Sequence, residues 1–363
     1  MKILHIVEDF SIKSGGLRTV VLNLDFFLKQ NGFESYILSS DKEKGDNIFT
    51  VSSNNGWLYS KEWKHKIKEI VDAYNINVIH VHGVWLYPQL IGAKFAVKNN
   101  IPLVLSCHGM YQPWLWKKGT LKKKIYLNLV SKKWFKKSSL IHSITSDETQ
   151  NIKKYFPKNN YFEIPNLISF TENQKVPEFE EKYILYLGRL NKTKGIDLLL
   201  KAFAQLNLED VSLKIAGGFN EYKPELEKLI NELGIQRKVN FLGEVKGNEK
   251  TTLIQEAWVM ASPTFSDVIG MVNLEAALHK TPIITTYKTG LHKDWNTNGG
   301  FLINPNVNEL KDKLEEAINW SAEKRLLHGQ QLFNFAKQNY SWNEQFFKWE
   351  KLYNSILKQE KKC

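Results

Sequence analysis

The chain has 363 residues and a formal net charge of +12, with 42% hydrophobic and 24% charged residues. This length and composition suit a globular α/β protein of two domains and exclude a disordered or fibrous one. Only two cysteines occur, Cys107 and Cys363, which excludes a disulfide framework.

The N-terminal sequence MKILHIVEDF contains no long apolar stretch. We therefore interpret it as a first strand and not as a signal peptide. No window of about 18 consecutive apolar residues occurs elsewhere, so the sequence predicts no membrane span. A cytoplasmic protein is the simplest expectation.

Short apolar segments alternate with amphipathic segments along the first half of the chain. The apolar segments predict strands, in chain order, at residues 2–7, 35–40, 77–83, 102–109 and 139–145. Helical periodicity predicts helices at residues 18–32, ended by Gly32, and at residues 87–100, ended before Pro102. Strands joined by helical crossovers form a parallel, doubly wound sheet.

The same alternation restarts after residues 164–182, a stretch rich in proline and polar residues. Strands are predicted at residues 183–188, 212–218, 238–243, 257–263, 281–286 and 299–304, with helices at residues 195–206 and 224–234 among those between them. We expect two Rossmann-like domains facing a cleft, the first at residues 1–168 and the second at residues 169–341. A last helix, within residues 342–363, carries aromatic residues on one face, and we expect it to complete the first domain.

The positive charge is concentrated in the first half. Residues 1–170 contain 24 lysines and arginines against 13 acids, and residues 111–146 contain nine lysines and no acid. In segment 111–137 the lysines alternate with Trp114, Trp116, Trp134 and apolar residues. This pattern favours a helix on an anionic bilayer over a nucleic-acid surface. A helix with an ordinary solvated lysine face is the remaining alternative.

Glycines and cations follow the carboxyl ends of several predicted strands, where ligands bind in open α/β sheets. The glycines expected on the donor side are Gly15, Gly16, Gly188, Gly217 and Gly218. Arg189 and Lys194 follow Gly188 with no acid between them, which fits a diphosphate clamp. Neither a P-loop nor a G-x-G-x-x-G motif after the first strand is present.

The sequence TFSDVIGMVNLEAAL, residues 264–278, predicts a helix that begins near Gly270. Free N–H groups of Gly270, Met271 and Val272 would attract an anion at the start of that helix. Glu275 could then accept hydrogen bonds from a ribose, and Asp267 from a sugar. The alternatives are an N-cap for Asp267 and a solvated helix position for Glu275.

Three histidines lie at or near strand ends. His108, in the sequence SCHGM, is a candidate for the reaction centre, with a hydrogen-bonded strand-end histidine as the alternative. His80 and His82 share one strand face and resemble a metal-ligand pair. Since no cysteine or acid stands beside them, we predict no metal there.

Eight motifs, taken together and in order, resemble those of family 4 of the retaining glycosyltransferases, which have the GT-B fold. They are SGGLRTVV (14–21), SCHGM (106–110), IPNLI (164–168), GRLNKTKGIDLLLKAF (188–203), KIAGG (214–218), VNFLGEV (239–245), SPTFSDVIGMVNLEAAL (262–278) and GGFLINP (299–305). The resemblance covers nearly the whole chain.

The resemblance implies a role for each candidate residue. Arg189 and Lys194 would bind the donor diphosphate, Glu275 the nucleotide ribose and Asp267 the donor sugar. His108 and the Gly15-Gly16 loop would line the reaction centre. It also implies front-face transfer with retention and without a metal or other cofactor, which agrees with the absence of an Asp-x-Asp triplet from the sequence. The catalytic residues expected are His108, Arg189, Lys194 and Asp267.

Three positions depart from the family pattern. Asp267 replaces the usual glutamate, Lys280 stands where glycine is usual, and Lys293 stands where glutamate is common. These departures leave open a catalytically impaired homologue that only binds a nucleotide sugar or glycan.

The charge distribution adds an expectation about the acceptor. The basic first domain favours a glycan carried on a polyprenyl diphosphate, at the inner face of the cytoplasmic membrane. Such an acceptor suits the assembly of a bacterial surface polysaccharide (O-antigen, capsule or exopolysaccharide). No nucleic-acid partner is expected.

Overall fold

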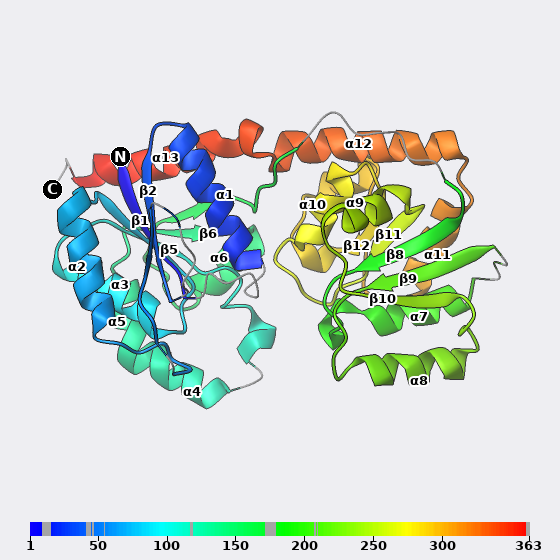
Figure 1. The fold of residues 1–363 in the computed structure, drawn as a ribbon, viewed down its shortest axis with the longest axis horizontal. Helices are drawn as coiled ribbons and strands as arrows, with labels where there is room; N and C mark the ends of the chain where they lie inside the picture. Colours follow the sequence, from blue (N-terminus) through cyan, green and yellow to red (C-terminus); the bar gives the residue numbers. More distant parts are fainter. Residues whose placement is uncertain are drawn as a thin grey trace. The chain divides into compact units, whose positions relative to one another are not determined.

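The computed structural model describes residues 1–8, 16–40, 45, 47–53, 55–116, 119–170, 179–206, 208 and 210–360. The chain forms two compact units (Figure 1). Unit 1 comprises Met1–Leu167 and Phe346–Cys363, and unit 2 comprises Ile168–Gln345. Each unit is an α/β domain built on one parallel sheet, which confirms the predicted fold class.

Unit 1 has a seven-stranded parallel sheet in the order β3-β2-β1-β4-β5-β6-β7. Its strands are β1 (Lys2–Ile6), β2 (Glu34–Ser39), β3 (Ile48–Thr50), β4 (Val78–His82), β5 (Leu103–Ser106), β6 (Leu140–Ser143) and β7 (Tyr161–Glu163). The chain first moves outward from β1 through β2 to β3 and then returns to place β4 on the other side of β1. The direction of winding therefore reverses between β1 and β4, which is the switch point of this sheet.

The helical segments of unit 1 are α1 (Gly16–Gln30), α2 (Glu62–Tyr74), α3 (Tyr87–Lys98), η2 (Pro113–Trp116), α4 (Thr120–Ile125), the π-helical η3 (Tyr126–Ser131), α5 (Lys132–Phe135) and α6 (Ser146–Lys153). The long helix α13 (Trp342–Glu360) begins in unit 2 and continues into unit 1. Within the part of the chain described, no helix has the length and apolarity that crossing a membrane requires.

The two faces of the first sheet differ in chemistry because side chains alternate along each strand. In β4, Ile79 and Val81 point to one face and join the aliphatic core with α2 and α3. His80 and His82 point to the opposite face, where His80 contacts Trp349 and Tyr353 of α13. Buried polar groups on this face need partners within the protein, and His80 bonds to Tyr353 and Ser106 while His82 bonds to His5 and His108.

Unit 2 has a six-stranded parallel sheet in the order β10-β9-β8-β11-β12-β13. Its strands are β8 (Lys182–Leu187), β9 (Val211–Ala216), β10 (Val239–Gly243), β11 (Val259–Ser262), β12 (Ile283–Thr286) and β13 (Phe301–Ile303). The winding reverses between β8 and β11. The switch point of this sheet therefore lies between these two central strands.

The helical segments of unit 2 are η4 (Lys192–Lys194), α7 (Ile196–Ala204), α8 (Lys223–Leu233), α9 (Gly247–Glu256), α10 (Met271–Leu278), η5 (Tyr287–Thr289), η6 (Lys293–Thr297), α11 (Val307–Ile318) and α12 (Ala322–Tyr340). Buried side chains of α7, α8 and α11 form the main core with the sheet. Helix α7 begins after Gly195, where a Cβ atom would lie only 2.1 Å from the carbonyl oxygen of Pro263. Glycine at this position lets the start of α7 touch the segment after β11.

Candidate functional site

The carboxyl ends of β8 and β11 bring the expected donor-site residues of unit 2 together. Arg189 follows β8, and Lys194 ends the short helix η4 just before α7. Asp267 lies in the segment between β11 and α10. The site therefore forms at the switch point of the sheet, where two loops diverge to opposite faces and leave room for a ligand.

Lys194 and Asp267 form an ion pair in this site. The Nζ atom of Lys194 lies 2.5 Å from Oδ2 of Asp267, and their side chains are 22% and 21% exposed. No acid stands between Arg189 and Lys194 in the sequence, but the fold brings Asp267 to Lys194 from 73 residues away. Arg189 is exposed, and no ion pair or hydrogen bond joins its guanidinium to any residue that the structure describes.

Hydrogen bonds to backbone carbonyl oxygens hold the two loops of the site in place. The carbonyl oxygen of Thr193 accepts from the backbone N–H of Phe265 at 2.8 Å and from the Thr264 hydroxyl at 3.0 Å. The hydroxyl of Tyr186 donates to the carbonyl oxygen of Arg189 at 2.9 Å. Burial raises the pKa of Tyr186, and the charge of Asp267 adds to this effect. The phenol is therefore a neutral donor that fixes the start of the Arg189 loop.

The start of α10 is open to a ligand. Gly270 precedes the helix with φ 60°, and no side chain caps the first turn. Oδ1 of Asp267 instead accepts the N–H of Val268 at 3.0 Å, so Asp267 is not an N-cap. The N–H groups of Met271 and Val272 stand at the positive end of the helix dipole, where an anion is favoured.

Glu275 lies in α10 opposite a lysine that the sequence analysis did not single out. The Nζ atom of Lys250, in α9, lies 2.8 Å from Oε1 of Glu275. Their side chains are 31% and 27% exposed, so Glu275 is not a fully solvated helix position. The strand end at Gly243 could have indicated Lys250 in the sequence. Helix α9 follows that strand, so its first turns lie at the same edge of the sheet as the site.

The candidate glycines occupy several places. Gly188 and Gly217 end adjacent strands, and a Cβ atom on Gly217 would lie 2.1 Å from the carbonyl oxygen of Gly188. Gly218 is exposed beside them. In unit 1, Gly16 begins α1 and has open space around it, whereas Gly15 lies outside the described residues.

His108 stands in a strained turn at the end of β5 in unit 1. Its φ is 50°, in the left-handed region, and Gly109 follows with φ 75°. The buried carboxyl group of Glu148 holds this turn, because it accepts the N–H of Gly109 at 2.6 Å and the N–H of Ile144 at 2.7 Å. Burial raises the pKa of Glu148 to about 7. Burial lowers the pKa of His108 to about 3, so its ring is neutral at neutral pH.

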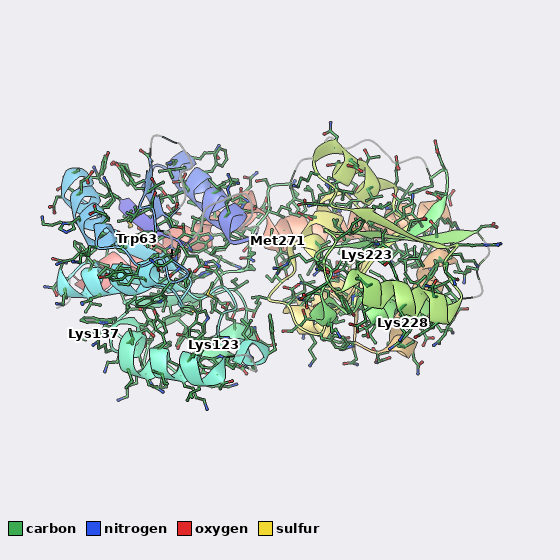
Figure 2. All side chains as sticks on the ribbon, turned by 60° about the horizontal axis from the view of Figure 1, so that its bottom comes forward. Trp63, Lys123, Lys137, Lys223, Lys228 and Met271 are labelled. Carbon is green, nitrogen blue, oxygen red and sulfur yellow. The ribbon has the colours of Figure 1, made fainter. Side chains whose placement is uncertain are left out.

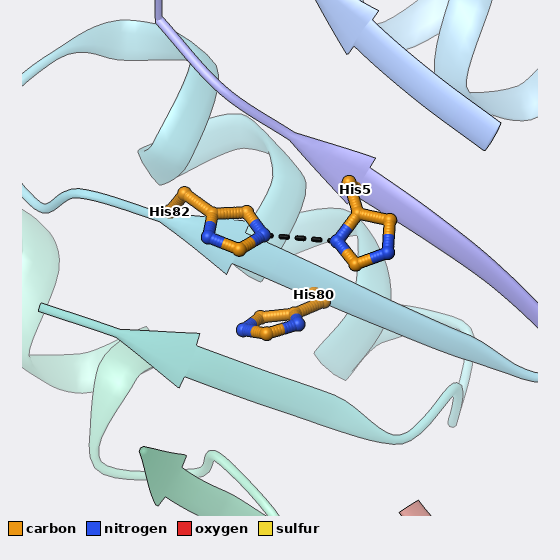
Figure 3. A group of neighbouring side chains, drawn as sticks. All are labelled: His5, His80 and His82. Carbon is orange, nitrogen blue, oxygen red and sulfur yellow. Dashed lines mark hydrogen bonds between the residues drawn. The ribbon is translucent and has the colours of Figure 1, made fainter. Parts of the chain in front are cut away.

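Three buried histidines gather at the switch point of the first sheet, and Figure 3 shows them. His5 on β1 and His80 and His82 on β4 offer ligand atoms within 4.8 Å of one another, so they form a possible metal group. Both nitrogens of His80 already bond to Tyr353 and Ser106. Both nitrogens of His82 bond to His5 and His108. A metal ion would have to displace these hydrogen bonds.

The lysine- and tryptophan-rich segment 111–137 forms η2, α4, η3 and α5, and Figure 2 labels Lys123 and Lys137 in it. Of its three tryptophans only Trp114 is exposed, because Trp116 is buried and Trp134 packs against the core. Lys123 also turns inward and donates to the carbonyl oxygen of Leu115. The sequence pattern suggested a helix whose lysines and tryptophans meet a bilayer, but Trp116, Trp134 and Lys123 do not face outward.

The exposed side of segment 111–137 carries an apolar stripe. Leu121, Ile125 and Leu129 follow one another at intervals of four residues and are 71%, 49% and 71% exposed. Exposed lysines stand within and after the stripe in the sequence, at positions 122, 124, 133, 136 and 137. An apolar stripe edged by lysines is the pattern of a helix that lies on a membrane surface.

Two family models match the chain. A model described as Glycosyltransferase Family 4 matches residues 14–171, and a model described as Glycosyl transferases group 1 matches residues 169–329. The chain belongs to glycosyltransferase family 4. The two models meet close to the border between unit 1 and unit 2, so each describes one domain of the family fold.

Curated relatives of the chain are also glycosyltransferases. An uncharacterised glycosyltransferase of Methanocaldococcus jannaschii is 32% identical over 174 residues, which cover 45% of this chain and 42% of that protein. A D-inositol 3-phosphate glycosyltransferase of Corynebacterium aurimucosum is 28% identical over 190 residues, which cover 49% and 44%. The matches thus span less than half the length of these two relatives. An alpha-monoglucosyldiacylglycerol synthase of Acholeplasma laidlawii is 25% identical over 317 residues, covering 75% of this chain and 77% of that protein.

Solved structures share the fold over nearly the full length. A sucrose-phosphate synthase from Thermosynechococcus elongatus has a TM-score of 0.78 at 17% identity, covering 99% of this chain and 100% of that one. The HepE protein of Anabaena, solved in complex with UDP-glucose, has a TM-score of 0.73 at 18% identity, covering 98% and 100%. At such low identity these matches establish the fold, which is GT-B.

Proposed function

We propose that this protein transfers a hexose-type sugar from a nucleotide-diphosphate sugar to a lipid-linked glycan, with retention of configuration and without a metal ion. The observation that carries the proposal is the arrangement of Arg189, Lys194 and Asp267 beside the open start of α10, at the switch point of the second sheet. Family membership supports the reaction class, and the UDP-glucose bound to the Anabaena protein of the same fold supports the donor class.

The donor diphosphate would lie between the two cations and the start of α10. Arg189 offers a planar fork of donors that matches phosphate oxygens. Lys194 is held by Asp267 in the free protein, and we infer that it exchanges this partner for the diphosphate. Asp267 then becomes free to accept hydrogen bonds from the sugar hydroxyls. The pair keeps Lys194 in place before the donor arrives.

The nucleoside would extend along α10. Glu275 would accept hydrogen bonds from the ribose hydroxyls, and Lys250 would hold the Glu275 carboxylate in position for them. A carboxylate accepts hydrogen bonds but cannot donate any, so it suits a diol that donates two. Lys250 is thus a positioning residue for Glu275.

The transfer step needs no protein nucleophile in this proposal. The bond from the anomeric carbon to the diphosphate oxygen breaks, and the acceptor oxygen bonds to the same face of that carbon. The acceptor hydroxyl gives its proton to the leaving diphosphate. Arg189, Lys194 and the N–H groups of α10 stabilise the charge that develops on the leaving group, which is where an enzyme lowers this barrier most.

The donor is tested by incubating the purified protein with UDP-, GDP-, ADP- and dTDP-sugars and measuring the release of free nucleoside diphosphate. Product NMR then reads the anomeric configuration. Release from one donor with the configuration retained supports the proposal, and an inverted product overturns the mechanism. Binding of a nucleotide sugar without any turnover, across lipid and glycan acceptors, would favour a catalytically impaired homologue.

The acceptor proposal rests on the exposed stripe of α4 and η3. We infer that Leu121, Ile125 and Leu129 enter the interface of an anionic leaflet while the flanking lysines contact lipid phosphates. Surface attraction is about 1 kcal/mol per lysine near such a leaflet, so a few lysines support reversible docking. A polyprenyl-diphosphate glycan presents an anion at that same surface, which suits the assembly of a bacterial surface polysaccharide at the inner face of the cytoplasmic membrane.

Docking is tested by sedimentation with phosphatidylglycerol-containing and phosphatidylcholine vesicles across a salt series. A Lys122/Lys124/Lys133→Gln variant is compared with a control that removes the same charge from other exposed lysines, Lys61/Lys64/Lys98→Gln. We expect salt-sensitive binding to the anionic vesicles, lost in the first variant and kept in the control. Equal loss in both variants, binding to oligonucleotides in a gel shift, or no binding at all would contradict the docking proposal.

A further inference from the structure

Two chains of hydrogen bonds link the buried histidines of unit 1. One runs from Tyr353 through His80, Ser106 and His142 to the carbonyl oxygen of Ile164, with distances of 2.7, 2.6, 2.7 and 2.9 Å. The other runs from His5 through His82 to His108. Burial lowers the pKa of every histidine in both chains, so each ring is neutral and carries one proton.

The direction of the first chain follows from its last acceptor. A carbonyl oxygen cannot donate, so Nε2 of His142 carries the proton and donates to Ile164. Nδ1 of His142 must then accept from the Ser106 hydroxyl, and the Ser106 oxygen must accept from Nε2–H of His80. Tyr353 donates to the remaining nitrogen of His80. Every donor and acceptor of this chain is thereby assigned.

The second chain has no carbonyl oxygen to set its direction. Nδ1 of His5 lies 2.9 Å from Nε2 of His82, and Nδ1 of His82 lies 3.0 Å from Nε2 of His108 (Figure 3 shows the first of these bonds). Each contact holds a single proton. The three rings must therefore share one tautomer, either all protonated on Nδ1 or all protonated on Nε2.

The buried end of this chain decides between the two states. Nε2 of His5 is fully buried and has no hydrogen-bond partner. With all three rings protonated on Nε2, that atom would be a buried N–H without an acceptor, which is rare in proteins. With all three protonated on Nδ1, only an unshared lone pair is left there. In the second state, His5 Nδ1–H donates to His82 and His82 Nδ1–H donates to His108.

We propose that His5 and His82 are positioning residues that hold His108 as the Nδ1–H tautomer, so that His108 meets the substrate as a hydrogen-bond donor and not as a base. The proposal rests on the function proposed above and on the place at the reaction centre that the family resemblance implies for His108. Nε2 of His108 is occupied by the proton of His82, and Nδ1–H has no partner among the described residues. The lowered pKa of His108 agrees, since a base would need to take up a proton.

A donor at this position fits the transfer chemistry. When the leaving diphosphate accepts the acceptor's proton, a histidine base is unnecessary, but a neutral N–H can hold a sugar or phosphate oxygen. The left-handed turn at His108, held by Glu148, sets the direction in which the His108 side chain leaves the backbone. His82 then sets which nitrogen carries the proton, as the partner of a histidine generally does.

The tautomers are read directly by two-bond ¹H–¹⁵N correlation spectra of the full-length protein labelled with ¹⁵N-histidine. We expect His5, His82 and His108 to be protonated on Nδ1, while His80 and His142 are protonated on Nε2 and serve as internal references. Protonation of His108 on Nε2, or different tautomers within the group of three, would overturn the proposal. A zinc titration that shifts these resonances stoichiometrically would do the same, because it would make the cluster a metal site.

Activity supplies the second readout, with a matched control on the same strand. His82→Leu and His80→Leu each remove a fully buried ring with two hydrogen-bonded nitrogens, but only His82 touches His108. We expect kcat to fall at least about tenfold in folded His82→Leu with donor KM little changed, and His80→Leu to keep its kcat. Equal losses would mean that His82 acts only structurally. If no nucleotide sugar is turned over, the proposed function fails, while the spectra still test the tautomers.

Discussion

Lys194 and Asp267, 73 residues apart in the chain, meet at 2.5 Å between the carboxyl ends of the two central strands of unit 2. The lysine that would bind a diphosphate is therefore paired with the carboxylate that would bind the sugar. An ion pair at a ligand-free site keeps both groups close to their working positions and limits the ordering that binding requires.

Replacing either cation should lower turnover sharply. We expect Lys194→Ala and Arg189→Ala to lower kcat about 10²-fold or more, because each removes a charge that stabilises the leaving diphosphate. Lys192→Ala is the matched control, since Lys192 belongs to the same short helix but pairs with Glu225 in solvent. Steady-state kinetics on the three variants give the answer. A kcat near that of the wild type in Arg189→Ala or Lys194→Ala would contradict the clamp.

Transfer should persist in excess EDTA. The charge of the diphosphate is met by Arg189, Lys194 and helix N–H groups, and the possible metal group found among the described residues consists of buried histidines in unit 1. The measurement is nucleoside diphosphate release before and after chelation. Activity that disappears with EDTA and returns with Mg²⁺ or Mn²⁺ would contradict metal independence.

Acid should destabilise unit 1 at a pH above that at which ordinary exposed carboxylates protonate. Burial lowers the pKa of His5 and His142 to about 4 from 6.5, so between those values the unfolded chain takes up protons that the folded chain cannot. Stability is therefore complete above pH 6.5 and is lost as the pH falls toward 4, by roughly 3 kcal/mol for each such histidine. Hydrogen exchange across a pH series localises this loss.

Two glutamine variants test whether buried or exposed histidines set the pH midpoint of acid unfolding. His142→Gln retains a donor for the carbonyl oxygen of Ile164 but does not titrate, so its unfolding midpoint should move to lower pH. His65→Gln, on the exposed side of α2, should leave the midpoint unchanged. Native exchange protection of unit 1 at pH 4 in the wild type would show that the histidines are not the acid-sensitive groups.

Lys280 occupies a left-handed position, with φ 55°, where the family usually has glycine. The departure therefore carries a backbone cost. We expect Lys280→Gly to be more stable than Lys280→Ala by about 1 kcal/mol, because only glycine relieves the left-handed strain. Urea unfolding measures the difference, and both variants should retain transfer. Loss of activity in both would link Lys280 to function and contradict a role confined to the backbone.

Much of the architecture was predictable because strand and helix periodicities are local properties. The apolar segments at residues 77–83 and 183–188 are β4 and β8 within one or two residues. The edge strands β3 and β7 were missed, since three residues carry too little alternation to be recognised. Lys250 and Glu148 were missed as well, because nothing near them in the sequence indicates the groups that they contact.

The two-domain α/β class, the family and the residue types at the strand ends can be inferred from local sequence patterns. Which charges pair and which stay free depends on tertiary contacts. Asp267 could be an N-cap or a sugar ligand by sequence, and its distance to Lys194 depends on the order of β8 and β11 in the sheet. His5 and His82 are separated by 77 residues, and only the pairing of β1 with β4 brings them into one hydrogen-bonded chain. Local periodicity specifies an element, whereas the long-range pairing of elements sets the contacts on which charge and proton placement depend.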